Sequence, residues 1–68
     1  MITYKPLWMT LINKEMKKMD LVEKGWISRG TLAKLGKNRH VSTGIIEKLC
    51  QGLDCQIEDV VEYIQNNP

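Results

Sequence analysis

The sequence has no phenylalanine, one histidine and two cysteines, and these shortages exclude several kinds of protein. Without phenylalanine, a hydrophobic core must be built from Leu, Ile, Val, Met and the two Trp and two Tyr residues. Cys50, Cys55 and His40 are too few to provide the four ligands of a structural zinc site, and no CxxC spacing occurs. We therefore expect no metal site, and we interpret the cysteines as reduced thiols that act as small apolar residues.

Long hydrophobic runs are also missing from the chain. No stretch approaches the roughly 20 apolar residues that a membrane-spanning helix needs. Residues 1–11 contain one lysine and no small-residue cleavage site, unlike a signal peptide. We therefore predict a cytoplasmic protein that has no membrane contact.

Motifs that carry catalysis are absent too. The chain has no HExxH motif, no Ser/His/Asp set and no glycine-rich loop for a phosphate group. The acidic pair Glu58 and Asp59 stands at a predicted helix start, where solvated carboxylates are favourable. The sequence therefore predicts a protein that is not an enzyme and uses no cofactor, and it offers no separate segment to bind a small-molecule ligand.

The length of 68 residues, with 43% hydrophobic and 26% charged residues, is typical of one small folded domain. No linker, internal repeat or low-complexity segment interrupts the chain. We therefore predict a single domain over residues 1–68.

Charge is distributed unevenly along the chain, although the net charge is only +2. Residues 1–40 contain nine basic and three acidic residues, a balance of +6, whereas residues 41–68 contain one basic and five acidic residues, a balance of −4. Residues 28–40 contain four basic residues and no acidic one. This polarity indicates a basic face and an acidic face, either as solvated surfaces or, for the basic face, as a surface that binds nucleic acid.

Helical periodicity dominates the rest of the pattern, so we expect an all-α, compact five-helix domain. The expected helices cover 6–14, 18–24 and 29–37, followed by one that starts after Ser42 and contains 45–50, and one that contains 57–64. Ser28 and Ser42 are predicted N-caps, and Gly52 is predicted to close the fourth helix in a left-handed conformation. Residues 1–5 are predicted to form a short extended arm or edge strand.

The segment over 17–37 has the pattern of a helix-turn-helix. Leu21 and Ile27 in the first helix and turn are spaced from Leu32 and Leu35 so that two crossed helices can share a small core. In this motif the second helix enters the DNA major groove with its N-terminus first. The helix over 29–37 is therefore the predicted recognition helix.

The chemistry of that helix also suits DNA. Its expected outward residues are Arg29, Gly30, Thr31, Lys34 and Lys37. An arginine can make a bidentate contact with guanine, and a threonine can bond a base edge or touch a thymine methyl group. A glycine lets the backbone approach DNA closely, and the lysines can reach phosphate or base edges. The residues of this expected helix therefore predict double-stranded DNA as the binding partner.

Several stretches of the chain are similar to a known family. They are KKMDL at 17–21, ISRGTLAKLGKN at 27–38, VST at 41–43, IEKLCQGLDC at 46–55 and IEDVVEYI at 57–64. With these stretches, the chain resembles the Cro/CI-type (Xre) helix-turn-helix domains of phage repressors, in particular the short stand-alone regulators of that group. The resemblance extends from Tyr4 to Ile64.

The resemblance implies a five-helix domain that binds duplex DNA, often as a homodimer on a palindromic site. By position, it implies a DNA-backbone contact for Lys18, base contacts for Arg29, Gly30 and Thr31, a base or phosphate contact for Lys34, and a phosphate contact for Asn38. Lys37 and Arg39 are further expected phosphate contacts, and Ser28 is an expected contact at the start of the recognition helix.

Two departures from the family pattern concern the turn and the start of the second helix. The turn usually has an apolar residue or threonine, then glycine, then isoleucine, whereas this chain has Gly25-Trp26-Ile27. Either Trp26 takes a strained backbone angle or the turn is rebuilt around Gly25. At the helix start, Lys18 replaces the usual glutamine, which exchanges an oriented amide contact for a point charge.

The leading hypothesis is therefore a sequence-specific transcriptional repressor that occupies its operator as a homodimer. Tyr63 and the Ile2/Tyr4 arm are candidate dimer surfaces, or else ordinary packing. A second hypothesis is a protein-interaction module of the same fold, such as an antitoxin or adaptor, that uses the acidic half. A third is a nonspecific nucleoid protein, which has no preference among DNA sequences.

Overall fold

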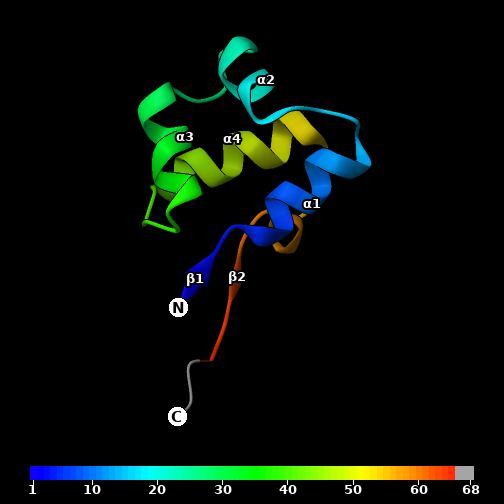
Figure 1. Cartoon of the computed structure of the whole chain (residues 1–68). Helices are drawn as coiled ribbons and strands as arrows, with labels where there is room; N and C mark the ends of the chain where they lie inside the picture. Colours follow the sequence, from blue (N-terminus) through cyan, green and yellow to red (C-terminus); the bar gives the residue numbers. More distant parts are fainter. Residues whose placement is uncertain (66–68) are drawn as a thin grey trace.

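The computed structural model describes residues 1–65, which form four α-helices, one 3-10 turn and a two-stranded sheet (Figure 1). The elements are β1 (Ile2–Thr3), α1 (Lys5–Asn13), α2 (Lys18–Glu23), α3 (Arg29–Gly36), α4 (Thr43–Leu53), η1 (Ile57–Asp59) and β2 (Glu62–Tyr63). The helices predicted over 6–14, 18–24 and 29–37 are confirmed, with ends that differ by one residue. The predicted extended arm is also confirmed, because it contains β1.

Two serine caps set where α3 and α4 begin. The Ser28 hydroxyl accepts a hydrogen bond from the backbone N–H of Thr31 at 3.1 Å, and the Ser42 hydroxyl accepts one from Ile45 at 3.2 Å. Each bond satisfies an amide that has no partner within its helix. The two predicted N-caps are therefore confirmed.

Each of the four helices in residues 1–65 ends in a Schellman motif, which closes the helix with one left-handed residue. The left-handed residues are Glu15 (φ 56), Gly25 (φ 76), Asn38 (φ 54) and Asp54 (φ 51). In every case the next N–H donates to the carbonyl five residues back, over 2.9–3.1 Å. These bonds satisfy carbonyls that the helix leaves unpaired, and the chain turns sharply after each helix.

The turn between α2 and α3 is rebuilt around Gly25. Gly25 has the left-handed φ of 76, and Trp26 does not take a positive φ. The N–H of Trp26 donates to the Leu21 carbonyl at 3.1 Å, which completes the Schellman motif of α2. The sequence left two possibilities for the shifted turn glycine. The strained backbone angle at Trp26 is wrong, and the turn is rebuilt around Gly25 instead.

Substitution of Gly25 by alanine is expected to destabilise the fold by about 1–2 kcal/mol, because a Cβ disfavours the left-handed conformation. Steric crowding contributes nothing, since no atom lies within 4 Å of the place where the Cβ would stand. Urea unfolding followed by circular dichroism measures the change. Gly25→Asn is the matched control, and it should lose less because asparagine tolerates this conformation. Equal stability of the alanine variant and the wild type would contradict the assignment.

The prediction that Gly52 closes α4 is wrong. Gly52 lies inside α4, and Asp54 is the left-handed residue. The glycine serves packing instead, because a Cβ on Gly52 would lie 2.6 Å from the indole ring of Trp26. The ring of the turn residue therefore rests against the backbone of α4, and only glycine leaves room for it.

The fifth helix predicted over 57–64 is also wrong. Only η1 forms there, and β2 then pairs with β1 in antiparallel register, with Ile2 opposite Tyr63. The spacing of the apolar residues fits a helix, but their β-branched and aromatic side chains also favour a strand. A short helix is marginal by itself, whereas the N-terminal arm offers a backbone partner for the strand.

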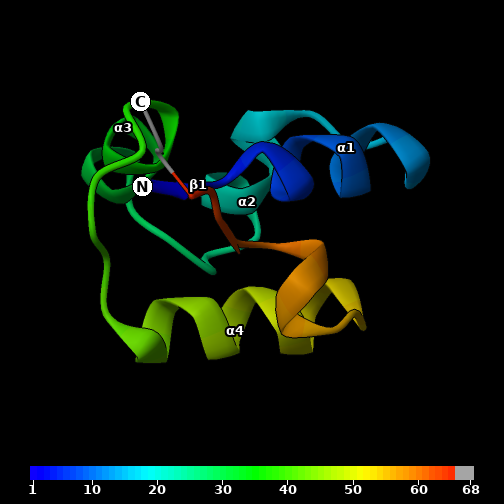
Figure 2. The same cartoon turned by 90° about the horizontal axis from the view of Figure 1, so that it is seen from below.

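The core lies between α4 on one side and α1, α2 and α3 on the other (Figure 2). Its fully buried side chains are Leu7, Leu11, Leu21, Leu35, Leu49, Leu53 and Val60. Every helix contributes at least one of them, and Val60 follows η1. Packing in this shared core therefore holds together helices that are too short to be stable alone.

Candidate nucleic-acid interface

The orientation of α3 relative to α2 is set by a small shared core. Leu21, Ile27 and Leu35 are buried, and Leu32 is half-buried against them. The helix-turn-helix core predicted from the sequence is therefore confirmed. Because these residues occupy the inner side of α3, its other side is left to face outward.

The outer side of α3 combines basic side chains with residues of little bulk. Its exposed residues are Arg29, Gly30, Ala33, Lys34, Gly36 and Lys37. Thr31, which was expected to be exposed, is half-buried beside the cap. Gly30, Ala33, Lys34 and Lys37 repeat at intervals of three and four residues, so they lie along one face of the helix. This face contains no acidic side chain, as a surface for polyanionic DNA requires.

Ala33 belongs to this face, although the sequence reasoning missed it. Its position, three residues after Gly30 and four after Arg29, was the signal that could have identified it. An alanine methyl group can touch the methyl group of thymine in the major groove. The outward face therefore offers an apolar contact as well as polar ones.

Ser28 and Thr31 are joined by two hydrogen bonds. The Ser28 hydroxyl accepts from the Thr31 N–H and donates to Thr31 Oγ1, each over 3.1 Å. Ser28 is thus engaged in capping, and it orients the first turn of α3.

The loop after α3 is tied down by Tyr4, from the opposite end of the chain. The Tyr4 N–H donates to Oδ1 of Asn38 at 3.1 Å, and the Tyr4 hydroxyl donates to the Arg39 carbonyl at 2.7 Å. Asn38 was predicted only as a phosphate contact, but its side-chain carbonyl has this internal partner. Its amide NH2 group and the Arg39 guanidinium lie on exposed residues. Tyr4 therefore positions two expected DNA contacts.

The variant Tyr4→Phe is expected to lose about 0.5–1.5 kcal/mol of folding stability, because the Arg39 carbonyl loses its hydrogen bond. Tyr4 is only 2% exposed, so water cannot fully replace that bond. Tyr63→Phe is the matched control, since Tyr63 is 66% exposed and its substitution should change little. Denaturant titrations of both variants make the comparison, and an equal loss in the two would exclude this role of the Tyr4 hydroxyl.

A model of a known protein family matches most of this chain. The model of the Cro/C1-type helix-turn-helix DNA-binding domain matches residues 6–66. The chain belongs to this family. A crystal structure of the transcriptional regulator VanUg is similar to it, with a TM-score of 0.89 and 38% sequence identity over 96% of this chain and 87% of that one. The comparison with curated proteins found no match.

The resemblance to Cro/C1-type domains predicted from the sequence is thus confirmed, and α2 and α3 are its helix-turn-helix. The fold differs from the expected five helices because a 3-10 turn and a strand replace the last one. Double-stranded DNA is the ligand that a domain of this family binds.

At the start of α2, this Cro/C1-type domain places Lys18 on an aromatic ring. Lys18 Nζ lies 4.4 Å from the centre of the Trp8 ring, a distance typical of a cation–π contact. The Lys17 N–H donates to Oδ2 of Asp20 at 2.8 Å, so a carboxylate already caps the start of this helix. The backbone amide of Lys17 is therefore already bonded within the chain.

The described residues 1–65 show no group of three or more His, Cys, Asp or Glu side chains that could hold a metal ion. In the same part of the chain, none of the helices has the length and apolar character needed to cross a membrane.

Proposed function

We propose that this Cro/C1-type domain binds duplex DNA sequence-specifically and represses transcription by occupying an operator. The carrying observation is the outward face of α3, which has basic and small residues and no acidic one. The helix is held by its buried leucines and by the Ser28 cap, so it can enter the major groove as a rigid element. The similarity to the transcriptional regulator VanUg supports a regulatory role.

The proposed DNA contacts are of two kinds, contacts with bases and contacts with phosphates. Arg29, Gly30, Thr31 and Lys34 read bases, and Ala33 adds a methyl contact. Lys18, Lys37, Asn38 and Arg39 hold phosphates on either side. Base contacts determine which sequence is bound, whereas phosphate contacts position the protein and make its affinity depend on salt.

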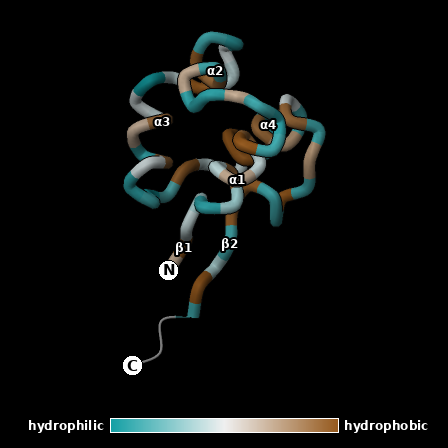
Figure 3. Tube along the Cα trace, turned by 45° about the vertical axis from the view of Figure 1, so that its right-hand side comes forward, coloured by the Kyte–Doolittle hydropathy of each residue, from teal (hydrophilic) through white to brown (hydrophobic). Residues whose placement is uncertain are grey.

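In this proposal, residues 1–68 form a single domain that acts in the cytoplasm. The domain binds DNA as a homodimer. Met1, Tyr63 and Ile64 are 58%, 66% and 40% exposed, and they cluster on the paired ends of β1 and β2. Figure 3 shows hydrophobic colour just beyond β2, outside the helical body. Tyr4, an earlier candidate for this surface, is buried and cannot contribute to it. A second copy that covers this apolar end would present two recognition helices to a palindromic site.

Selection from random duplex DNA at near-physiological salt tests the proposal. An enriched inverted repeat, with half-sites about one helical turn apart, is the expected result for a dimeric operator-binding protein. Sedimentation at tens of micromolar, free and on DNA, tests the homodimer separately, and a monomer in both states would refute it. Absence of any enrichment or gel shift would overturn the DNA-binding proposal. A shift that is equal for all sequences would instead indicate a nonspecific nucleoid protein.

The Gly30→Ala variant separates binding from folding. No packing requires this glycine, because the nearest atom to an added Cβ is Ser28 Oγ at 3.8 Å. Alanine should stabilise the helix by about 0.5–1 kcal/mol. Against DNA, the added methyl should weaken binding by roughly tenfold, as expected for an overpacked contact of about 1.4 kcal/mol.

Gly36→Ala is the matched control for this variant, because Gly36 is also helical and has no atom within 4 Å of an added Cβ. Its position lies off the stripe of residues that begins with Gly30, so its affinity for DNA should change little. Thermal unfolding and gel shifts on the selected site measure both variants. Equal affinities of the two alanine variants would exclude a close approach of DNA at Gly30.

A further inference from the structure

The C-terminal end of α4 brings the two cysteines of the chain together. Cys50 and Cys55 occupy the two positions of a Schellman motif whose side chains commonly touch. The backbone N–H of Cys55 donates to the Cys50 carbonyl at 3.1 Å. At the end of α1, the same two positions hold Leu11 and Met16, which both belong to the apolar core. In α4, two thiols therefore replace an apolar pair of the same geometry.

The two thiols are free and half-buried. Burial, together with the neighbouring Cys50 thiol and the Asp59 carboxylate, raises the pKa of the Cys55 thiol. Cys55 therefore holds its proton more tightly than an ordinary cysteine does.

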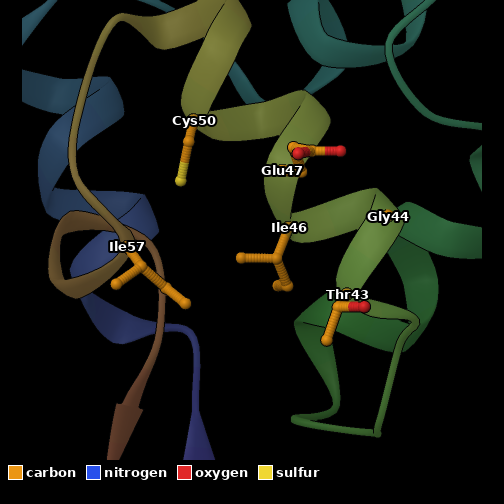
Figure 4. A pocket seen from close by; sticks show the side chains of 6 residues that line it. All are labelled: Thr43, Gly44, Ile46, Glu47, Cys50 and Ile57. Atoms are coloured by element: carbon orange, nitrogen blue, oxygen red, sulfur yellow. The ribbon is translucent and has the colours of Figure 1, made fainter.

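Cys55 lines an open groove together with Lys14 and Asp59, and the Cys50 thiol is likewise accessible to a small oxidant. Cys50 lines an open groove of about 460 Å³ between α4 and η1, with Ile46 and Ile57 among the other lining residues. Figure 4 shows its sulfur pointing into this space, and among the described residues 1–65 the only charged one that lines it is Glu47. A molecule as small as hydrogen peroxide can therefore reach Cys50 without any opening of the fold.

We propose that Cys50 and Cys55 are a redox modification site, at which a peroxide converts the two thiols into a reversible disulfide. A disulfide requires Cα atoms roughly 4.4–6.8 Å apart. The hydrogen bond between the two backbones keeps the cysteines near each other and thereby favours this spacing. The site lies at the junction of α4 and η1, on the opposite end of α4 from the Ser42 cap.

The reaction balances with one peroxide for two thiols. The Cys50 thiolate attacks one peroxide oxygen, the O–O bond breaks, and the product is a sulfenic acid, with the other oxygen leaving as water after it takes up a proton. The Cys55 sulfur then attacks the sulfenic sulfur. Its proton leaves with the hydroxyl group as a second water, and the S–S bond forms. The two thiols supply the two electrons that reduce the peroxide.

Tryptic digestion of the peroxide-treated full chain tests the proposal. Lys48 is the last basic residue, so the peptide over 49–68 contains both cysteines and no other cleavage site. This peptide should become lighter by about 2 Da, the mass of the two hydrogens lost on disulfide formation, and should regain that mass with a dithiol reductant. A peptide that gains oxygen on one cysteine without losing two hydrogens would overturn the proposal, as would a disulfide between two chains only.

Two variants assign the order of the steps. In Cys55→Ser, oxidation should stop at the Cys50 sulfenic acid, which a sulfenic-specific nucleophile such as dimedone traps. In Cys50→Ser, dimedone labelling of Cys55 should be several-fold slower, because that thiol holds its proton. Faster labelling of Cys55 than of Cys50 would overturn the assigned order. Because the wild-type digest already reports the disulfide, the proposal stays testable if either variant fails to fold.

Discussion

The Leu35→Ala variant is expected to lose about 2–5 kcal/mol of folding stability, the usual range for a leucine cut to alanine in a packed core. Leu35 has 0% exposure and lies beneath the outward face of α3. A domain of 68 residues has a total stability of about 3–10 kcal/mol, at about 0.05–0.15 kcal/mol per residue. The substitution therefore removes a large part of the stability, and DNA binding should be lost with the fold.

Urea titration followed by circular dichroism measures this loss. Ile12→Ala is the control, because Ile12 is an apolar residue that is 67% exposed, and its truncation should change stability by less than about 0.5 kcal/mol. If Leu35→Ala loses no more than Ile12→Ala, then α3 is not held by the core as described.

The Arg29→Ala variant is expected to bind its selected DNA site about 10- to 100-fold more weakly, because a bidentate arginine–base contact provides about 1–3 kcal/mol of discrimination. Arg29 is exposed at the first position of α3, next to the Ser28 cap, so its removal should leave the fold intact. Arg29→Lys should lose affinity as well, since lysine keeps the charge but not the planar fork. Gel shifts on the selected site and on single-base variants of it provide the measurement.

Lys48→Ala controls for the loss of positive charge. Lys48 is exposed on α4 and is the only basic residue after position 40 in the sequence, so its removal should leave DNA affinity unchanged. Salt dependence distinguishes the two kinds of contact for Arg29. If it reads a base, the variant loses preference at one base pair and the salt slope is retained. A uniform loss on all sequences, with a log–log salt slope reduced by about 0.9, would instead place Arg29 on a phosphate.

The local signals in this sequence were sufficient for α1, α2, α3 and the start of α4. Ser28 and Ser42 cap helices through residues three positions away, and such bonds depend on short stretches of chain alone. The outward face of α3 could be predicted for the same reason. Helical spacing separates Leu32 and Leu35 from Lys34 and Lys37, whatever the rest of the chain does.

Distant pairings were beyond the reach of sequence patterns. Tyr4 and Asn38 are 34 positions apart, and nothing in either segment indicates their hydrogen bond. A glycine at position 52 is typical of a helix end, yet the role of Gly52 is to leave space for the Trp26 ring. The Schellman contact of Cys50 and Cys55 depends on where α4 ends, which in turn depends on Asp54 rather than on Gly52.

The sequence by itself determined the family, the helix-turn-helix and the basic recognition helix, because these follow from caps, periodicity and residue chemistry within short segments. Only the tertiary structure decided that 57–64 forms a 3-10 turn and a strand, that the turn is built around Gly25, and that Tyr4 holds the loop after α3. The physical reason is that a short apolar segment fits a helix or a strand almost equally well. Whether such a segment forms a helix or a strand then depends on the backbone partner that lies beside it in the folded chain. Here that partner is the N-terminal arm.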